Sequence, residues 1–386
     1  MHREEQMTAA YQSGTFVGRV WRPDVEGPSL VTLREGQFVD ITSKAVPTMR
    51  DLLDLDDPVA HARSAPGKTL APLSAVMGRS EAGKAGELHL LAPCDLQAIK
   101  ACGVTFARSM IERVIEERAA GDAARAEAIR ARVTAIIGNS LRNLKAGSPE
   151  SARVKAALIE EGVWSQYLEV GIGPDAEVFT KAQPLSSVGW GAPVGLHPVS
   201  RWNNPEPEIV LAVASNGRVK GATLGNDVNL RDVEGRSALL LGKAKDNNAS
   251  CAIGPFIRLF DETYSIDDVR NADLDLLIEG ADGFRLEGAS TMREISRDPL
   301  DLVAQTIGPH HQYPDGLMLF MGTLFAPVED RDEPGQGFTH KLGDVVTISS
   351  PALGSLVNTV RLATECQPWT FGTTALMRNL AKRELL

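Results

Sequence analysis

Alternating apolar and polar positions mark the start of the chain as β-structure. Residues 16–20 and 30–41 alternate in this way around the pair Glu35-Gly36, a pattern typical of a β-hairpin. Residues 64–85 are instead rich in Gly, Pro, Ser and Ala, and we expect a linker there. The pattern predicts a small β-rich N-terminal domain over residues 1–90.

A helix with one apolar side follows. Apolar residues recur at helical spacing over residues 110–115, and the opposite side is charged. The charged residues are Glu112, Arg113, Glu116 and Glu117. Because their signs are mixed, we expect most of this side to be solvated. Ser148-Pro149-Glu150 indicates another helix start, since serine caps helices and proline suits their first turn.

Short strands separated by turns dominate from residue 177 onward. Residues 209–214, 274–278 and 344–350 are predicted strands, and the last forms a hairpin with residues 356–360. The chain lacks the regular strand–helix alternation of a doubly wound sheet. We therefore predict an α+β, β-rich fold with a main domain over residues 91–386.

Composition narrows the classes of function. The chain has 386 residues, of which 43% are hydrophobic and 23% charged, as in folded globular proteins. Its 40 Lys and Arg against 50 Asp and Glu leave a net charge of −10, which disfavours nucleic-acid binding. We find no apolar leader, no run long enough for a bilayer and no Cys-x-x-Cys pair among four cysteines. We expect a cytoplasmic protein without a membrane partner.

Glu206-Pro207-Glu208 is the first stretch that suggests chemistry. In a strand, residues two apart face the same side roughly 7 Å from each other. Two buried carboxylates repel each other and lose hydration unless a cation joins them, and Mg²⁺ prefers such oxygen ligands. Alternatively, Pro207 suits an edge strand with two solvated glutamates. Both interpretations remain open on spacing alone.

Two later stretches are ambiguous in the same way. Residues 221–232 end in a polar cluster in which Asp227 could be a third ligand, or Asp227 and Arg231 could be an ordinary turn pair. Residues 242–255 place a lysine, Lys243 or Lys245, among small and apolar residues, so its amine either reaches solvent or is buried with a lowered pKa.

Other candidate functional residues and motifs give weaker indications of chemistry. His310, His311 and His340 lack the spacing of a helical zinc pair, and we expect loop or substrate-pocket residues. Cys251 is predicted to be a buried structural thiol. The chain shows no Walker A lysine, nucleophile elbow or nicotinamide-binding fingerprint.

Taken together and in this order, the three stretches resemble the fumarylacetoacetate hydrolase family. Glu206 and Glu208 match its Glu-x-Glu strand, and Asp227 with Arg231-Asp232 matches its second strand. Lys245 matches the lysine that precedes its Cys-Pro-Ile-Gly-Pro segment.

Two weaker elements extend the resemblance. The family's Gly-x-Asn-Tyr-x-x-His-x-x-Glu corresponds to residues 103–112, and its Thr-Gly-Thr-Pro to residues 321–324. The likeness runs from about residue 91 to the C-terminus. It implies a mixed β-sandwich roll of the fumarylacetoacetate hydrolase type, and a homodimer or homotetramer.

One departure from the family pattern is informative. Ser109 replaces the histidine that helps to activate the hydrolytic water, whereas its partner glutamate is present as Glu112. This disfavours C–C bond hydrolysis and suits elimination of water. The whole chain is also similar to a subgroup, the 2-keto-3-deoxypentonate dehydratases, for example over residues 164–170, 245–248 and 310–316.

The resemblance implies a metal-dependent dehydratase acting on a 2-keto-3-deoxypentonate derived from D-xylonate or L-arabinonate. Its product would be 2,5-dioxopentanoate, in non-phosphorylative pentose breakdown. Glu206, Glu208 and Asp227 would hold Mg²⁺ or Mn²⁺. Lys245 would be the base at C3, provided that burial lowers its pKa towards neutrality.

The remaining roles that the resemblance implies concern the leaving group and the substrate. Glu112 would protonate the departing 4-hydroxyl. Arg231 and Thr323 would orient substrate oxygens, and Ser109 is a further substrate-binding candidate.

Two alternatives remain. A hydrolase of a 2,4-diketo acid belongs to the same family, and Ser109 argues against it. A sugar-acid-binding protein without turnover would need neither Glu112 nor Lys245. The configuration at C4 of the substrate depends on the shape of the pocket, so both enantiomers stay open.

Overall fold

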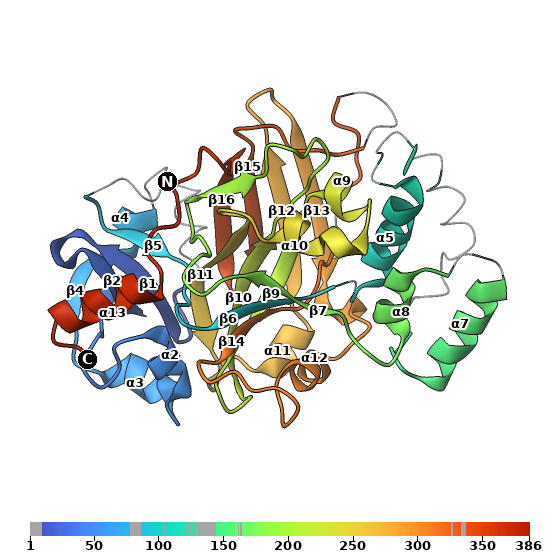
Figure 1. Ribbon diagram of the computed structural model, residues 1–386. Coiled ribbons are helices and arrows are strands. Elements are labelled where there is room, and N and C mark those ends of the chain that lie inside the picture. The colour runs from blue at the N-terminus through green and yellow to red at the C-terminus, as the bar shows by residue number, and fades with distance from the viewer. Residues whose placement is uncertain are drawn as a thin grey trace.

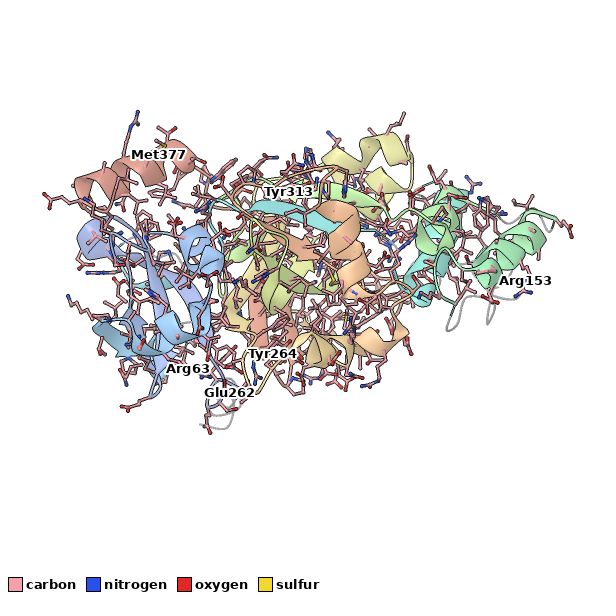
Figure 2. All side chains as sticks on the ribbon, turned by 90° about the horizontal axis from the view of Figure 1, so that it is seen from below. Arg63, Arg153, Glu262, Tyr264, Tyr313 and Met377 are labelled. Carbon is pink, nitrogen blue, oxygen red and sulfur yellow. The ribbon has the colours of Figure 1, made fainter. Side chains whose placement is uncertain are left out.

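Two β-sheets lie at the centre of the computed structural model, with helices around them (Figure 1). The structure describes residues 10–77, 86–103, 105–120, 144–160, 164–325, 327–332 and 337–386, and also residues 122, 125, 126, 129 and 162. The molecule is elongated: helix α13 (Thr373–Lys382), which carries Met377, lies at one end and helix α7 (Pro149–Glu160), which carries Arg153, at the other (Figure 2).

The N-terminal strands form the hairpin that the alternation predicts. The strands are β1 (Phe16–Arg22), β2 (Gly27–Arg34), β3 (Gln37–Asp40), β4 (Lys68–Pro72) and β5 (His89–Leu91). Strands β2 and β3 pair antiparallel up to Arg34 and Gln37, and both turn residues, Glu35 and Gly36, have positive φ. Two such residues in a row match the twist of a two-residue hairpin loop.

The linker expected over residues 64–85 is wrong for residues 68–77. Strand β4 pairs with β3, and helix α4 (Leu73–Met77) buries Val76 and Met77. The error has a physical cause, because β4 is a half-exposed edge strand and needs few apolar residues. Residues 78–85 lie outside the described part of the chain.

The larger sheet runs through the whole molecule in the order β4-β3-β2-β1-β11-β10-β9-β14-β6-β7, with β5 beside β1. Its other strands are β6 (Ala98–Cys102), β7 (Val178–Ala182), β9 (Pro207–Val213), β10 (Val219–Asp227), β11 (Cys251–Leu259) and β14 (Leu317–Phe320). Strand β1 pairs with β11 at Val17 and Ile257, so the N-terminal strands extend the sheet of the main domain. The boundary at residue 90 stays a prediction.

The second sheet packs against the first in the order β13-β12-β15-β16-β8. Its strands are β8 (Pro193–Leu196), β12 (Asp273–Glu279), β13 (Arg285–Thr291), β15 (Val345–Ser350) and β16 (Gly354–Leu362). Strands β15 and β16 form the hairpin predicted from the sequence. These mixed sheets with peripheral helices confirm the α+β, β-rich prediction.

The core surrounds β9, every residue of which is buried. Because side chains alternate along a strand, Ile209 and Leu211 join the cluster that contains residues of the second sheet, such as Leu356. Val210 and Ala212 join the opposite cluster. A polar group placed on this strand is therefore far from water on both faces of the sheet.

Helices cover the edges of the sheets. They are α2 (Met49–Asp54), α3 (Pro58–Ser64), α5 (Ala107–Ala119), α8 (Gln166–Ile172), α9 (Arg231–Glu234), α10 (Leu241–Lys245), α11 (Ile266–Arg270) and α12 (Pro299–Thr306), with short 3-10 turns at Pro23–Val25, Ala238–Leu240 and Met292–Glu294. The predicted helix start at Ser148 is confirmed, because its side chain accepts a hydrogen bond from Ser151 N. In the described parts of the chain, no helix is long and apolar enough to cross a membrane.

Helix α5 confirms the apolar periodicity. Met110 and Val114 are fully buried and pack with Leu168 of α8 in a separate small cluster. The apolar side thus faces α8, which lies beside α5 in Figure 1. On the charged side, Arg113 pairs with Glu206 just before β9.

A tight contact in this sheet gives a test of the packing. A Cβ on Gly225 would lie 2.3 Å from the ring of Phe320 and 2.5 Å from Val210 Cγ2. We expect Gly225→Ala to lower the free energy of unfolding by about 1–3 kcal/mol through overpacking. Gly242→Ala is the control, because a Cβ there meets nothing within 4 Å; in a helix it should be neutral or stabilising. Equal urea midpoints for the two variants would contradict the packing.

Candidate active site

The three carboxylates predicted as metal ligands lie together. Glu206 directly precedes β9, Glu208 is its second residue and Asp227 ends β10. The strands are in register there, and Asp227 N donates to Glu206 O at 3.0 Å. One oxygen from each of the three side chains lies within 4.8 Å of the others, and all three residues are buried. In the described part of the chain this is the one such group of His, Cys, Asp or Glu residues.

The charges in this triad are unevenly neutralised. Burial raises the pKa of Glu206, but the charges of Lys245 and Arg113 outweigh it and lower the pKa to about 2. Burial and the neighbouring charges of Asp227 and Glu206 raise the pKa of Glu208 well above its ordinary value. A cluster of buried oxygens with excess negative charge suits a hard divalent cation, so the residues present fit Mg²⁺ or Mn²⁺.

Lys245 closes one side of the triad. It ends helix α10, and its Nζ donates to Glu206 Oε2 at 2.5 Å and to Asp227 Oδ2 at 3.1 Å. Burial lowers the pKa of this amine, but the charges of Asp227, Glu206 and Glu234 outweigh burial and raise it. The expected lowering of the Lys245 pKa is therefore not found in this arrangement, in which Lys245 is an ammonium.

Lys181 is a second buried cation, which the sequence analysis did not single out. Its Nζ lies 2.8 Å from Asp227 Oδ1 and also donates to the backbone oxygens of Val228 and Lys245. Glu177, Phe179 and Lys181 occupy every second position from the residue before β7 into the strand. Glu177 and Phe179 line the pocket described next. Alternation of this kind could have marked the strand as part of the site.

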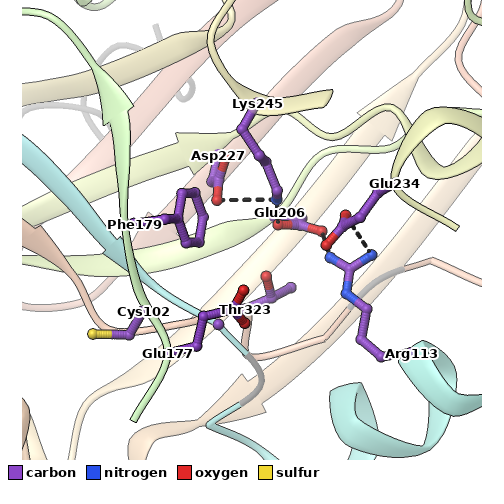
Figure 3. A pocket seen from close by; sticks show the side chains of 10 residues that line it. Cys102, Arg113, Glu177, Phe179, Glu206, Asp227, Glu234, Lys245 and Thr323 are labelled. Carbon is purple, nitrogen blue, oxygen red and sulfur yellow. Dashed lines mark hydrogen bonds and ion pairs between the residues drawn. The ribbon is translucent and has the colours of Figure 1, made fainter. Parts of the chain in front are cut away.

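A small pocket opens over the triad (Figure 3). It is lined by Cys102, Gly103, Arg113, Glu177, Phe179, Glu206, Asp227, Glu234, Lys245 and Thr323. Burial raises the pKa of Glu177, whose carboxyl group points towards Thr323, so the pocket contains a carboxyl group suited to carrying a proton.

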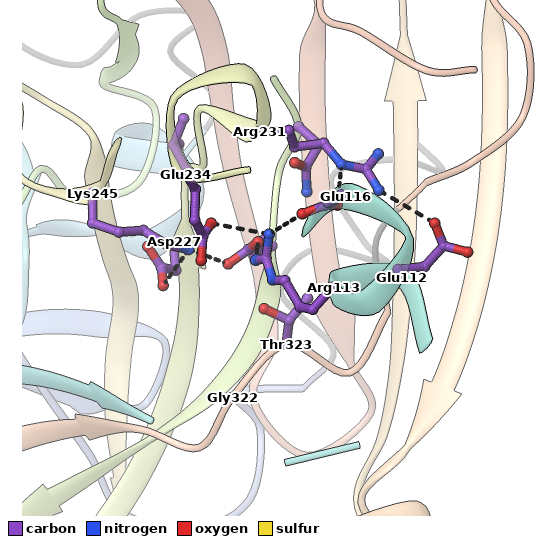
Figure 4. A network of polar contacts seen from close by, with 12 residues as sticks. Glu112, Arg113, Glu116, Asp227, Arg231, Glu234, Lys245, Gly322 and Thr323 are labelled. Atoms are coloured by element: carbon purple, nitrogen blue, oxygen red, sulfur yellow. Dashed lines mark hydrogen bonds and ion pairs between the residues drawn. The ribbon is translucent and has the colours of Figure 1, made fainter. Parts of the chain in front are cut away.

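The charged side of α5 is buried, contrary to the expectation of a solvated face. Arg113 Nη1 donates to Glu116 Oε2 at 2.6 Å and lies 2.9 Å from Glu234 Oε2, and Nη2 donates to Glu206 Oε1 (Figure 4). Burial raises the pKa of Glu234, and it remains about 7 beside Arg113 and Lys245. Helical periodicity does not distinguish charged residues in water from those that meet buried partners.

Glu112 and Arg231 lie behind this network. Arg231 Nε donates to Glu116 Oε1 at 2.6 Å, and its guanidinium stacks 4.9 Å from the Trp202 ring centroid. Glu112 Oε2 lies 3.5 Å from Arg231 Nη2. Neither residue is among those that line the pocket, so their roles towards substrate stay predictions.

The other predicted substrate residue with a described side chain, Thr323, lines the pocket. Its hydroxyl donates to Glu208 Oε1 at 3.3 Å, and Gly322 N donates to Glu208 Oε2 at 2.7 Å. These two donors orient Glu208 within the triad. Ser109 belongs to α5, but its side chain lies outside the described residues.

The histidines lie away from the triad. His310 and His311 are in an exposed loop, as expected. His340 is buried, and its Nδ1 is 3.1 Å from Asp344 Oδ2, which also pairs with Arg331. This arrangement fastens a loop to the second sheet.

Metal addition should stabilise the protein through Glu208. At a free Mg²⁺ concentration 100 times Kd, we expect the free energy of unfolding to rise by about 2.7 kcal/mol. Glu208→Gln should remove most of this gain. The pKa of Glu208 is higher in the folded state than in the unfolded state. The wild type therefore loses stability as the pH rises above the ordinary carboxyl pKa. Glutamine has no such cost, so without metal Glu208→Gln should be at least as stable as the wild type. Urea unfolding with Mg²⁺ or EDTA measures both effects. An unchanged Mg²⁺ gain in Glu208→Gln would exclude it as a ligand.

Comparisons with known proteins agree with this geometry. Residues 175–361 match the family model described as the C-terminal region of fumarylacetoacetate hydrolase. A 2-dehydro-3-deoxy-D-arabinonate dehydratase of Saccharolobus solfataricus is 31% identical over 188 residues, 48% of this chain and 58% of that protein. A probable 2-keto-3-deoxyxylonate dehydratase of Haloferax volcanii is 30% identical over 201 residues, 52% of this chain and 65% of that protein. The matches thus span less than two thirds of these curated relatives.

Solved structures show the same fold. A 2-keto-3-deoxy-D-arabinonate dehydratase complexed with magnesium and 2,5-dioxopentanoate aligns with a TM-score of 0.62 at 20% identity, over 90% of this chain and 99% of that one. A fumarylacetoacetate hydrolase of Exiguobacterium antarcticum aligns with a TM-score of 0.55 at 15% identity, over 90% and 99%. These likenesses confirm the predicted fold. The segment that matches the fumarylacetoacetate hydrolase family model, residues 175–361, contains all three carboxylates of the triad.

Proposed function

We propose that the protein is a metal-dependent hydro-lyase that converts a 2-keto-3-deoxypentonate to 2,5-dioxopentanoate. The observation that carries the proposal is the buried triad of Glu206, Glu208 and Asp227 with Lys245 in direct contact. The names of the two relatives support the class of substrate.

The triad supplies the site for the cation. Glu206, Glu208 and Asp227 would hold Mg²⁺ or Mn²⁺, and Gly322 N and the Thr323 hydroxyl keep Glu208 in place. When bound, such a cation polarises a 2-keto oxygen and so acidifies the neighbouring C3 protons. The three carboxylates are buried, and the low dielectric around them strengthens every charge interaction in which they take part.

Lys245 is our proposed base. It is an ammonium while Glu206 and Asp227 hold it, so it can accept the C3 proton only after these contacts open and the amine is neutral. Lys181 holds the backbone oxygen of Lys245 and fixes the end of α10 while the side chain moves. In the overall reaction C3 loses a proton and C4 loses its hydroxyl as water. This elimination leaves a C3=C4 double bond conjugated with the 2-keto group. Transfer of a proton from C5 to C3 then gives the C4=C5 enol, which gains a proton at C4 and loses its hydroxyl proton to become the C5 aldehyde.

The proton for the 4-hydroxyl has two candidate donors. The sequence predicts Glu112, which lies against Arg231 behind the pocket. The structure adds Glu177, which lines the pocket and has a raised pKa because it is buried. A general acid must carry a proton, and burial shifts Glu177 towards its protonated form, so we favour Glu177.

The reaction can be followed by ¹H NMR with racemic 2-keto-3-deoxypentonate and Mg²⁺, beside an EDTA-treated sample. We expect the aldehyde of 2,5-dioxopentanoate, or its hydrate, only in the sample with metal. The fraction consumed shows whether one enantiomer or both react. Unchanged substrate after addition of Mn²⁺ would contradict the dehydratase, and cleavage of a 2,4-diketo acid would then identify a hydrolase.

Three variants test the proton-transfer roles. We expect Lys245→Ala and Glu177→Gln each to lower kcat by about 10²–10⁴-fold, the usual contribution of a general acid or base. Glu112→Gln should cost less, because it lies outside the pocket. Single-turnover NMR of each variant at saturating Mg²⁺ measures the effect. Near-normal kcat for Lys245→Ala would exclude it as the base, and a larger loss in Glu112→Gln than in Glu177→Gln would reverse the acid assignment.

A further inference from the structure

Arg113 ties helix α5 to the carboxylate triad. It is buried and meets carboxylates from three segments: Glu116 on α5, Glu234 at the end of α9, and Glu206 just before β9. Figure 4 shows its guanidinium between Glu116 and Glu234. The segments are joined by one side chain because a guanidinium offers donors in several directions within one plane.

The two oxygens of Glu206 have different partners. Arg113 donates to Oε1, and Lys245 donates to Oε2. A cation that binds Glu206 must therefore compete with one of these two side chains. The contacts indicate which one gives way.

Among the described residues, Lys245 forms ion pairs with Glu206 and Asp227 alone, and both belong to the triad. A divalent cation would neutralise both partners at once, and Lys245 would lose what holds it there. Arg113 keeps Glu116 and Glu234 in any case, and neither belongs to the triad. The arrangement therefore favours release of Lys245 and retention of Arg113 on Oε1.

We propose that Arg113 is a positioning residue that holds Glu206 Oε1, presents Oε2 to the cation, and thereby couples the docking of α5 to metal binding. This inference rests on the proposed function. Residues that donate to a metal ligand fix its orientation, and their loss typically costs about 10–100-fold in metal affinity.

The coupling must be reciprocal. If docking of α5 through Arg113 strengthens metal binding, metal binding must strengthen the docking of α5 by the same factor. Metal binding that orders Glu206 would then also stabilise the packing of α5 against one side of the pocket. A contact that only stabilised the fold would not respond to metal.

Mn²⁺ binding measured by electron paramagnetic resonance, without substrate, tests whether Arg113 strengthens metal binding. We expect Arg113→Met to raise the Kd for Mn²⁺ by about 10–100-fold, and Arg113→Lys, which keeps the charge but loses the fork of donors, to raise it less. Arg118→Met is the matched control, because Arg118 lies on the same helix but donates to Gly162 O away from the triad. Its Kd should equal that of the wild type.

Hydrogen exchange of the α5 amides, with and without Mn²⁺, tests whether metal binding strengthens the docking of α5. Mn²⁺ should slow exchange in the wild type and in Arg118→Met, and should have little effect in Arg113→Met. If Arg113→Met does not fold, as judged by circular dichroism, Arg113→Lys gives the same comparison with an intermediate effect.

The outcomes separate this inference from the proposed function. If the wild type binds Mn²⁺ and both Arg113 variants bind it equally well or more tightly, Arg113 does not position Glu206 and the inference is overturned. If the wild type does not bind Mn²⁺ at all, the proposed function fails and takes the inference with it. Weaker binding in the Arg113 variants alone, with a lost metal response of α5, supports it.

Discussion

The structure depends on how buried negative charge is balanced at the ends of β9 and β10. Glu206, Glu208 and Asp227 stand where water is excluded, and an isolated carboxylate there would be strongly unfavourable. Lys245 and Arg113 offset much of this cost through short ion pairs. Burial and repulsion still leave the pKa of Glu208 well above normal, so the balance is incomplete and suits one more positive group.

The large sheet makes this arrangement possible. The register that pairs β9 with β10 sets Glu208 opposite Gly225 and brings Glu206 beside Asp227. Both neighbours of β9 are themselves buried strands, so the backbone there has little freedom. Ligands on such rigid elements keep their geometry better than ligands on loops.

The positively charged side chains come from elements other than β9 and β10. Lys245 ends a short helix, Lys181 lies on the last strand of the sheet, and Arg113 lies on α5. A rigid set of carboxylates is thus met by side chains on separate segments. Such a division would let the positive groups move while the ligands stay in place. The proposed elimination needs this, because Lys245 would have to change from an ammonium to a neutral base.

The sequence by itself determined the β-rich fold, both hairpins, the apolar side of α5, and the residues of the triad with Lys245. The fold, the hairpins and the helix side depend on local periodicity. The triad and Lys245 were singled out by the resemblance to a family motif that runs from residue 206 to residue 245. Only the tertiary structure decided that Arg113 and Lys181 join the site and that the Lys245 pKa rises. Arg113 and Glu206 are 93 residues apart. A charged residue looks the same in sequence whether it meets water or a buried partner, because its pKa depends on neighbours that only folding assembles.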